Sequence, residues 1–324
     1  MQLTRRAAVA AFGLTAGLGP GAAFGAIYPS RPVRLVIPFP PGGTTDVVAR
    51  RIGTALSDVL GQQIVVDNRG GAGGVIGADL VAKAPADGYT LLLFHSGMIY
   101  GPALYPSLPY DVVGDFTPIG LIGTAPSALV VTPSLPARDV AEFVALAKVS
   151  PGALNFGSAG VGTSSHLAPE LFDVVAGVKT THVPYRGGGP AVVATMSGQI
   201  QFMIETAGSL VPQIREGRVR ALGVSSAQRF RVIPEVPTIA ESGLPGFVYD
   251  TWYGLWGPAR LPAQIVEAVN AGLRRVLAND KVRSALEADG IVAAPSSPSA
   301  FAELVRTDLA KWTKIIREAG IRTQ

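Results

Sequence analysis

A strand, a stiff turn and a helix start follow one another in Leu35–Ala49 (LVIPFPPGGTTDVVA). The apolar run Leu35–Ile37 is typical of a buried strand, and the polar residues Thr44–Asp46 precede a helical pattern that begins at Val47. A helix start presents unpaired backbone N–H groups and the positive end of the helix dipole, and both attract an anion. The segment therefore predicts an α/β unit that recognises a small acidic molecule.

The N-terminus has the organisation of an export signal. A basic pair, Arg5 and Arg6, precedes the apolar stretch Ala7–Leu18, and small residues follow. The apolar stretch is shorter than the roughly 20 residues that cross a membrane. We expect a periplasmic protein with a cleavage site between Gly25 and Ala26, exported by the Sec route or, given the basic pair, by the twin-arginine route.

Composition excludes several classes of protein. The formal net charge of the 324 residues is only +4, and no block of Lys or Arg could follow a nucleic acid. The chain has no cysteine, so it forms no disulfide and carries no lipid anchor on a thiol. About 300 residues remain after the signal, which is enough for two domains. The 39 glycines and 26 prolines are dispersed and indicate many tight turns.

Strands and helices alternate along the chain, which favours an α/β architecture with parallel sheets. The expected strands are Val33–Ile37, Ile64–Asp67, Thr90–Phe94, Ala128–Thr132, a strand from Asn155, Thr181–Pro184, Ile200–Ile204, Ala221–Ser225 and Tyr253–Trp256. The expected helices are Val47–Leu60, Gly77–Lys83, Val140–Lys148, Ser164–Val175, Gly189–Ser197, Pro262–Leu277, Lys281–Asp289 and Pro298–Glu318.

A second loop of the same kind lies in Asn155–Leu167 (NFGSAGVGTSSHL). It also places glycines and hydroxyl residues at a helix start, and ligands of open α/β sheets bind at the carboxyl ends of the strands. If the two loops belong to different domains, they face each other across a cleft. Neither loop contains Lys or Arg, so backbone N–H groups, hydroxyls and helix dipoles must compensate the charge of an anion; Arg186 is the nearby cation.

These motifs also resemble one protein family. YPSRPVRLVIPFPPGGTTDVVAR, VVDNRGGAGGVIGADLVAKAPADGYTLLL, LNFGSAGVGTSSHLAPELF, THVPYRGGGPA and WYGLWGPA stand in the same order as in the Bug-type periplasmic receptors, which are the solute-binding proteins of tripartite tricarboxylate transporters. The resemblance covers nearly the whole mature chain.

The resemblance implies a two-domain periplasmic binding protein (flytrap) fold, with two mostly parallel sheets flanked by helices and the ligand in the interdomain cleft. Residues 26–125 together with 250–324 would form domain I, and 126–249 would form domain II. The implied ligand is a small carboxylate. The implied partners are the large and small membrane permease subunits, and the receptor itself would be a monomer.

The resemblance also implies a set of ligand-binding residues, two of which, His95 and Glu205, depart from the family pattern. Domain I would contribute Phe39, Gly42, Gly43, Thr44, Asp46, His95 and Ser96, and domain II would contribute Gly162, Thr163, Ser164, Tyr185, Gly187, Glu205 and Thr206. Simpler roles stay open for some of them. Gly42 and Gly43 can serve turn geometry alone, Asp46 can cap its helix, and Glu205 can be a surface or hinge carboxylate.

Other functions have weaker support in the sequence. Ser164, Ser165 and His166 are adjacent, but no G-x-S-x-G motif is present and neighbours on a helix do not face each other, so we expect no enzyme. With three histidines and no metal-binding spacing we expect no metal site, and we expect no cofactor either, because Gly70–Gly74 lacks the spacing of a nucleotide loop. A receptor that presents its bound acid to a membrane sensor kinase remains an alternative.

Overall fold

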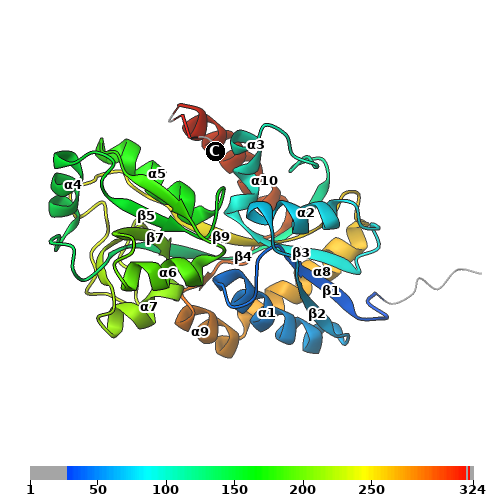
Figure 1. Ribbon diagram of the computed structural model, residues 1–324. Helices are drawn as coiled ribbons and strands as arrows, with labels where there is room; N and C mark the ends of the chain where they lie inside the picture. Colours follow the sequence, from blue (N-terminus) through cyan, green and yellow to red (C-terminus); the bar gives the residue numbers. More distant parts are fainter. Residues whose placement is uncertain (1–27, 319, 322–324) are drawn as a thin grey trace, which may run out of the picture.

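The computed structural model describes residues 28–318 and 320–321, so the predicted export signal and its cleavage site lie outside the described residues. Two α/β halves lie side by side, and long strands pass between them (Figure 1). The first half is built on β1–β3 and carries the C-terminal helices, and the second half is built on β5–β8. No helix in the described part of the chain has the length and apolar character needed to cross a membrane.

Strands and helices alternate along most of the chain, as predicted. The strands are β1 Val33–Ile37, β2 Ile64–Asn68, β3 Thr90–His95, β4 Phe116–Val131, β5 Asn155–Ser158, β6 Thr181–Pro184, β7 Phe202–Thr206, β8 Arg220–Val224, β9 Asp250–Pro258 and β10 Val292–Ala293. The helices are α1 Thr44–Leu60, α2 Val75–Ala82, α3 Gly101–Leu104, α4 Val140–Val149, α5 Ser164–Ala176, α6 Gly188–Met196, α7 Ala207–Arg215, α8 Ala263–Ala278, α9 Asp280–Ala288 and α10 Pro298–Glu318, with short 3₁₀ turns at Ala72–Gly74 and Ser96–Ile99. Of these elements, α3, α7, β10 and the part of β4 before Ala128 were not predicted.

The strand order β2-β1-β3-β9-β4-β7-β5-β6 shows how the halves are joined. Strand β4 pairs with β9 from Phe116 to Pro126 and with β7 from Ser127 to Val131, so it crosses from the first half to the second. The expectation of mostly parallel sheets needs a correction. The outer pairs β1–β2, β1–β3, β5–β6 and β5–β7 are parallel, but every pair that involves β4 or β9 is antiparallel, because these strands carry the chain to and fro between the halves.

Buried apolar strands and one-sided helices form the cores. Strand β3 is buried from Leu91 onward, as expected of a strand covered on both faces. Helix α1 buries one face, including Val48 and Ile52, in a cluster shared with α8. The halves also touch directly: a Cβ added at Gly208, at the start of α7, would lie 1.7 Å from the carbonyl oxygen of Asp289 after α9. Such close backbone contact tolerates only glycine at this position.

Candidate ligand-binding site

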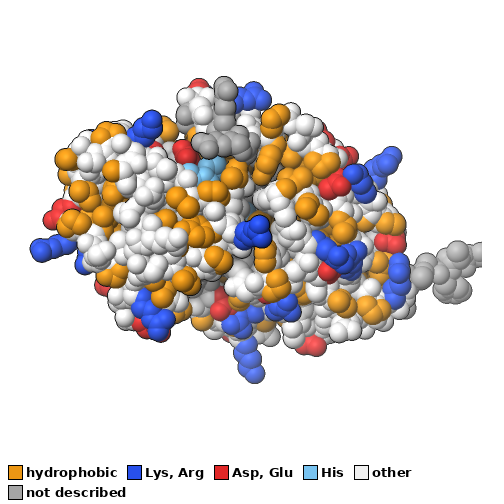
Figure 2. Space-filling view, in the orientation of Figure 1, with side chains coloured by type: hydrophobic (Ala, Val, Ile, Leu, Met, Phe, Trp, Pro, Cys, Tyr) orange, Lys and Arg blue, Asp and Glu red, His pale blue; other side chains and the backbone are white. Residues whose placement is uncertain are grey.

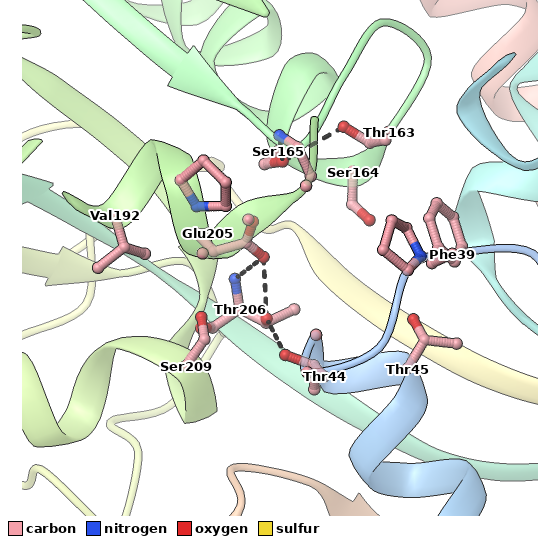
Figure 3. Close-up of a pocket in the computed structure, with 18 of the residues that line it drawn as sticks. Phe39, Thr44, Thr45, Thr163, Ser164, Ser165, Val192, Glu205, Thr206 and Ser209 are labelled. Atoms are coloured by element: carbon pink, nitrogen blue, oxygen red, sulfur yellow. Dashed lines mark hydrogen bonds between the residues drawn. The ribbon is translucent and has the colours of Figure 1, made fainter. Parts of the chain in front are cut away.

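A cavity of about 600 Å³ lies between the two halves. The starts of four helices line it: α1 from the first half, and α5, α6 and α7 from the second (Figure 3). Of the residues that the sequence singled out, the cavity is lined by Phe39, Gly42, Gly43, Thr44, His95, Thr163, Ser164, Gly187, Glu205 and Thr206. It is not lined by Asp46, Ser96, Gly162 or Tyr185. The ligand-binding role of the residues in the cavity stays a prediction.

The start of helix α1 presents bare backbone to the cavity. Gly43 is the N-cap residue and has no capping side chain, and the N–H groups of Thr44 and Thr45 find no acceptor within the described chain. Gly42 has φ +90°, a conformation that glycine adopts without strain. The turn therefore leaves amide donors free at the positive end of the helix dipole.

Asp46 holds this turn in place from behind. Its carboxylate accepts hydrogen bonds from the N–H of Gly42 (3.0 Å) and the side-chain amide of Asn68 (3.0 Å), and it pairs with Arg50 (3.0 Å). Burial opposes ionisation, but these hydrogen bonds outweigh it and lower the pKa of Asp46. The acid is thus neither the N-cap nor part of the cavity wall. It shapes the loop that forms the wall.

The start of helix α5 is built from side chains that bond to their own loop. The hydroxyl of Thr163 donates to the carbonyl of Gly160 (2.7 Å), and the hydroxyl of Ser165 accepts from the N–H of Ala159 (2.9 Å). The hydroxyl of Ser164 lies on the cavity side, 3.3 Å from Nδ1 of His95 on the opposite half. Ser164 is therefore the hydroxyl of this turn that faces the first half.

An aromatic pair, Phe39 and His95, forms the wall beside α1. The rings stack with centroids 4.8 Å apart. Burial lowers the pKa of His95 to about 3, so the imidazole is neutral. Its Nδ1 accepts the N–H of Gly97 (2.8 Å), which assigns the ring proton to Nε2. His95 is thus a polar but uncharged part of the wall.

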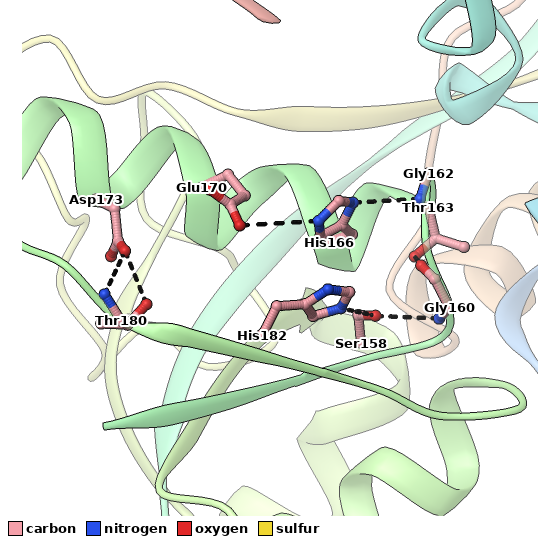
Figure 4. A network of polar contacts seen from close by, with 9 residues as sticks. All are labelled: Ser158, Gly160, Gly162, Thr163, His166, Glu170, Asp173, Thr180 and His182. Atoms are coloured by element: carbon pink, nitrogen blue, oxygen red, sulfur yellow. Dashed lines mark hydrogen bonds and ion pairs between the residues drawn. The ribbon is translucent and has the colours of Figure 1, made fainter. Parts of the chain in front are cut away.

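A second polar network lies between α5 and the strands β5 and β6, and its histidines do not line the cavity (Figure 4). His166 and His182 stack at 4.1 Å, Nδ1 of His166 accepts the N–H of Gly162 (3.2 Å), and His182 bonds to Ser158 (2.6 Å). Burial lowers the pKa of His166 to about 3 and of His182 to about 4. These neutral rings support the loop before α5. In the described part of the chain no cluster of His, Cys, Asp and Glu could hold a metal ion.

Glu205 and Thr206, at the end of β7, connect the two halves. One carboxylate oxygen of Glu205 accepts the N–H of Thr206 (2.7 Å) and its hydroxyl (2.9 Å). The same hydroxyl lies 3.0 Å from the hydroxyl of Thr44, which closes a polar chain across the cleft (Figure 3). Burial raises the pKa of Glu205, and the hydrogen bonds from Thr206 and Ser165 only partly offset this.

At the starts of α6 and α7 the sequence analysis named Gly187, Glu205 and Thr206 but missed Gly188, Gly189 and Ser209, which also line the cavity. Gly187 is the N-cap of α6 with φ +114°, and Gly188 and Gly189 follow it in the wall. The run of three glycines and the Thr206 that caps α7 were signals that could have marked these turns. Tyr253 of β9 is buried and also lines the cavity.

Charged side chains at this site lie mainly at its edge. Arg186 lines the cavity but is exposed, and no acid lies within ion-pair distance of it in the described chain. Arg218 also lines the cavity and pairs with Glu216 (2.8 Å). Over the face shown in Figure 2, basic and acidic side chains are scattered and form no broad basic patch.

Comparisons with known proteins identify the family and agree with the fold. Residues 48–321 match the family described as "Tripartite tricarboxylate transporter family receptor". A "UPF0065 protein in tcbD-tcbE intergenic region" from Pseudomonas sp. (strain P51) is 46% identical over 90% of this chain and 87% of its own length. Protein BugT of Bordetella pertussis is 38% identical over 91% of each chain. Among solved structures, "R. palustris Rpa4515 with adipate" has a TM-score of 0.88 at 36% identity, covering 91% of this chain and 100% of that one.

Proposed function

Because this chain belongs to the receptor family of tripartite tricarboxylate transporters, we propose that it binds a small organic acid in the cavity between its halves and delivers it to a membrane transporter. The convergence of four helix starts on one cavity carries the proposal. Free N–H groups and hydroxyls there can each contribute roughly 1.5–3 kcal/mol through a hydrogen bond to a charged group. The adipate in the related solved structure is an acid of the same class.

The ligand carboxylate belongs, in this proposal, between the starts of α1 and α5. The amides of Thr44 and Thr45 and the hydroxyl of Ser164 come from opposite halves, so a carboxylate held by both favours closure. The Ser164 hydroxyl has one proton, so in this proposal it turns from Nδ1 of His95 to the ligand. Phe39 and His95 would cover it with an uncharged wall. No step of this binding requires catalysis, and we propose a receptor without enzymatic activity.

The domain boundaries and the partners are further parts of the proposal. The switch of β4 partners after Pro126, opposite Asp250 of β9, supports a domain I of residues 26–125 and 250–324 and a domain II of residues 126–249. The proposed partners are the large and small permease subunits of such a transporter, reached after export to the periplasm. The family match favours this role over presentation of the ligand to a sensor kinase.

A thermal-shift screen of mono- and dicarboxylates, aromatic acids and amino acids tests the proposal. A ligand at 100 times its Kd stabilises the folded protein by about 2.7 kcal/mol, which a melting curve resolves. Gly43→Val should remove the shift, because a Cβ at Gly43 meets no atom within 4 Å and the side chain would extend into the space in front of α1. Gly114→Val, outside the cavity, is the matched control. If no acid stabilises the protein, the proposal fails.

A further inference from the structure

The carboxylic acid of Glu205 lies in the wall of a cavity whose other polar groups suit an anion. Glu205 lines the cavity, yet no Lys, Arg or His lies within ion-pair distance of it among the described residues. Its partners are hydroxyl and amide donors from Thr206 and Ser165. Donors of this kind suit an ionised carboxylate, which only accepts hydrogen bonds.

The position of this acid divides the cavity into two ends. One oxygen of Glu205 accepts the N–H of Thr206, the N-cap of α7, and the other lies 3.1 Å from the position of a Cβ at Gly188, in the first turn of α6. The protein's own carboxylate therefore occupies the place between the starts of α6 and α7. The starts of α1 and α5 remain for the carboxylate of the ligand (Figure 3).

We infer that Glu205 determines specificity: among carboxylates it selects those whose second polar group donates a hydrogen bond, such as an ammonium or an amide, over those with a second carboxylate. The inference rests on the proposed function and names the ligand class of that same cavity. An ionised Glu205 accepts a hydrogen bond from such a donor. It repels a second carboxylate, and the low dielectric of a closed cleft strengthens both effects.

An ionised carboxylate can accept about four hydrogen bonds, and Thr206 and Ser165 donate three to Glu205, which leaves one place for a ligand donor. The oxygen bonded to Thr206 already accepts two hydrogen bonds. Because the Thr206 hydroxyl donates to Glu205, the Thr44 hydroxyl must donate to Thr206, and this orders the chain of donors toward the acid. Arg186 is the cation that could instead receive a second carboxylate, but it is exposed at the edge of the cavity.

The inference is tested by measuring, by calorimetry at mildly alkaline pH, the affinities of sets of acids that share a carbon skeleton. Within each set only the group at the second end of the acid differs. For the four-carbon and six-carbon chains the probes are the diacid, its monoamide, the amine-terminated acid and the plain monocarboxylate. A rigid set consists of terephthalate, its monoamide and 4-aminobenzoate. In the wild-type protein the donor-terminated member of any skeleton that binds should bind at least about ten-fold more tightly than its diacid. In Glu205→Gln, which places an amide donor at the end of the side chain, this preference should fall below about three-fold or reverse.

Two further variants make the result specific. Glu205→Asp keeps the charge and should keep the direction of the preference, which guards against a folding defect in the Gln variant. Glu235→Gln removes an exposed acid of the second half outside the cavity and should change nothing. The inference, but not the proposed function, would be overturned if a diacid bound the wild-type protein as tightly as its monoamide, Glu205→Gln left both affinities unchanged and Arg186→Ala weakened binding of the diacid. Failure of every skeleton to bind, together with a thermal-shift screen in which no acid stabilises the protein, would overturn the proposed function as well.

Discussion

Asp46 and Glu205 are both carboxylic acids beside helix starts, but their surroundings give them different roles. Asp46 is paired with Arg50 and hydrogen-bonded to the turn before α1, and its pKa is lowered. No cation of the described chain lies within ion-pair distance of Glu205, and burial raises its pKa. Asp46 therefore stabilises the turn before α1, whereas Glu205 lines the cavity. Residue type at a helix start therefore does not decide function without the partners of that residue.

The hydroxyl of Ser164 and the guanidinium of Arg186 provide opposite tests of how the acid is held. Ser164→Ala should weaken binding of an acid found in the screen by about ten-fold, since it removes a hydrogen bond to a charged group. Arg186→Lys should change affinity by less than about three-fold, because an exposed cation contributes little. Calorimetry measures both. A loss of two orders of magnitude in Arg186→Lys with Ser164→Ala silent would mean that a guanidinium holds the acid.

At the scale of elements, the sequence predicts the helices and strands that carry uninterrupted patterns. The strands at Val33–Ile37 and Thr181–Pro184 and the helix at Pro298–Glu318 have the predicted bounds. The first part of β4, from Phe116, was not predicted, because prolines and glycines break its apolar pattern and its pairing with β9 is set by the whole fold. Helix α7 was not predicted either, since Gly208 and Pro212 are poor helix formers.

In the candidate site too, the parts formed by local sequence were predicted and the parts formed by the overall fold were not. The turns before α1 and α5 were predicted from local patterns, because each contains a strand, glycines and capping residues in sequence. Their meeting with α6 and α7 depends on the crossing of β4, which no local pattern reveals. The pairing of Asp46 with Arg50 is different: the two lie four residues apart on α1, a local signal that the sequence analysis did not use.

Helix α5 carries a test of stability against pH. Glu170 lies 3.8 Å from His166 and near Asp173, and burial raises its pKa to about 7, well above the value of about 4.3 for an unfolded chain. The folded protein therefore binds more protons than the unfolded chain between these values, and its stability falls as pH rises through this window. Glu170→Gln removes this loss.

Urea denaturation as a function of pH measures the effect. We expect Glu170→Gln to be more stable than the wild-type protein above pH ~7 and about equal to it near pH ~4.3, since only the ionised acid is unfavourable. Glu235→Gln, which replaces an exposed acid of the second half, is the matched control. A Glu170→Gln curve parallel to that of the wild-type protein would show that this carboxyl titrates normally.

At the scale of the whole molecule, β4 and β9 join the halves, which also touch through buried apolar side chains, close backbone contact at Gly208 and polar contacts across the cleft. The hydroxyls of Thr44 and Thr206 lie 3.0 Å apart, and Ser164 lies 3.3 Å from His95. Neither contact is a charged pair, so each contributes little by itself. A ligand carboxylate that bonds to both halves replaces the weak contact of Ser164 with a hydrogen bond to a charged group and can set the balance between open and closed forms.

Export is a property of the whole chain that the described residues do not test. The basic pair Arg5 and Arg6 before a short apolar stretch predicts a mature protein that begins near Ala26. N-terminal sequencing of the protein from a periplasmic fraction measures this directly. An uncleaved product in the membrane fraction would contradict the predicted signal peptide.

Closure of the cleft gives the last prediction. A bound acid that bridges α1 and α5 should make the protein more compact, because a ligand shifts an equilibrium only through its better affinity for one form. Small-angle scattering should show a smaller radius of gyration at saturating ligand. Thr44→Val removes the hydroxyl contact with Thr206 and should raise the ligand concentration needed for compaction, whereas Thr54→Val, on the exposed side of α1, should not. An unchanged radius in the wild-type protein, together with equal ligand affinities for the two valine variants, would refute closure around the ligand.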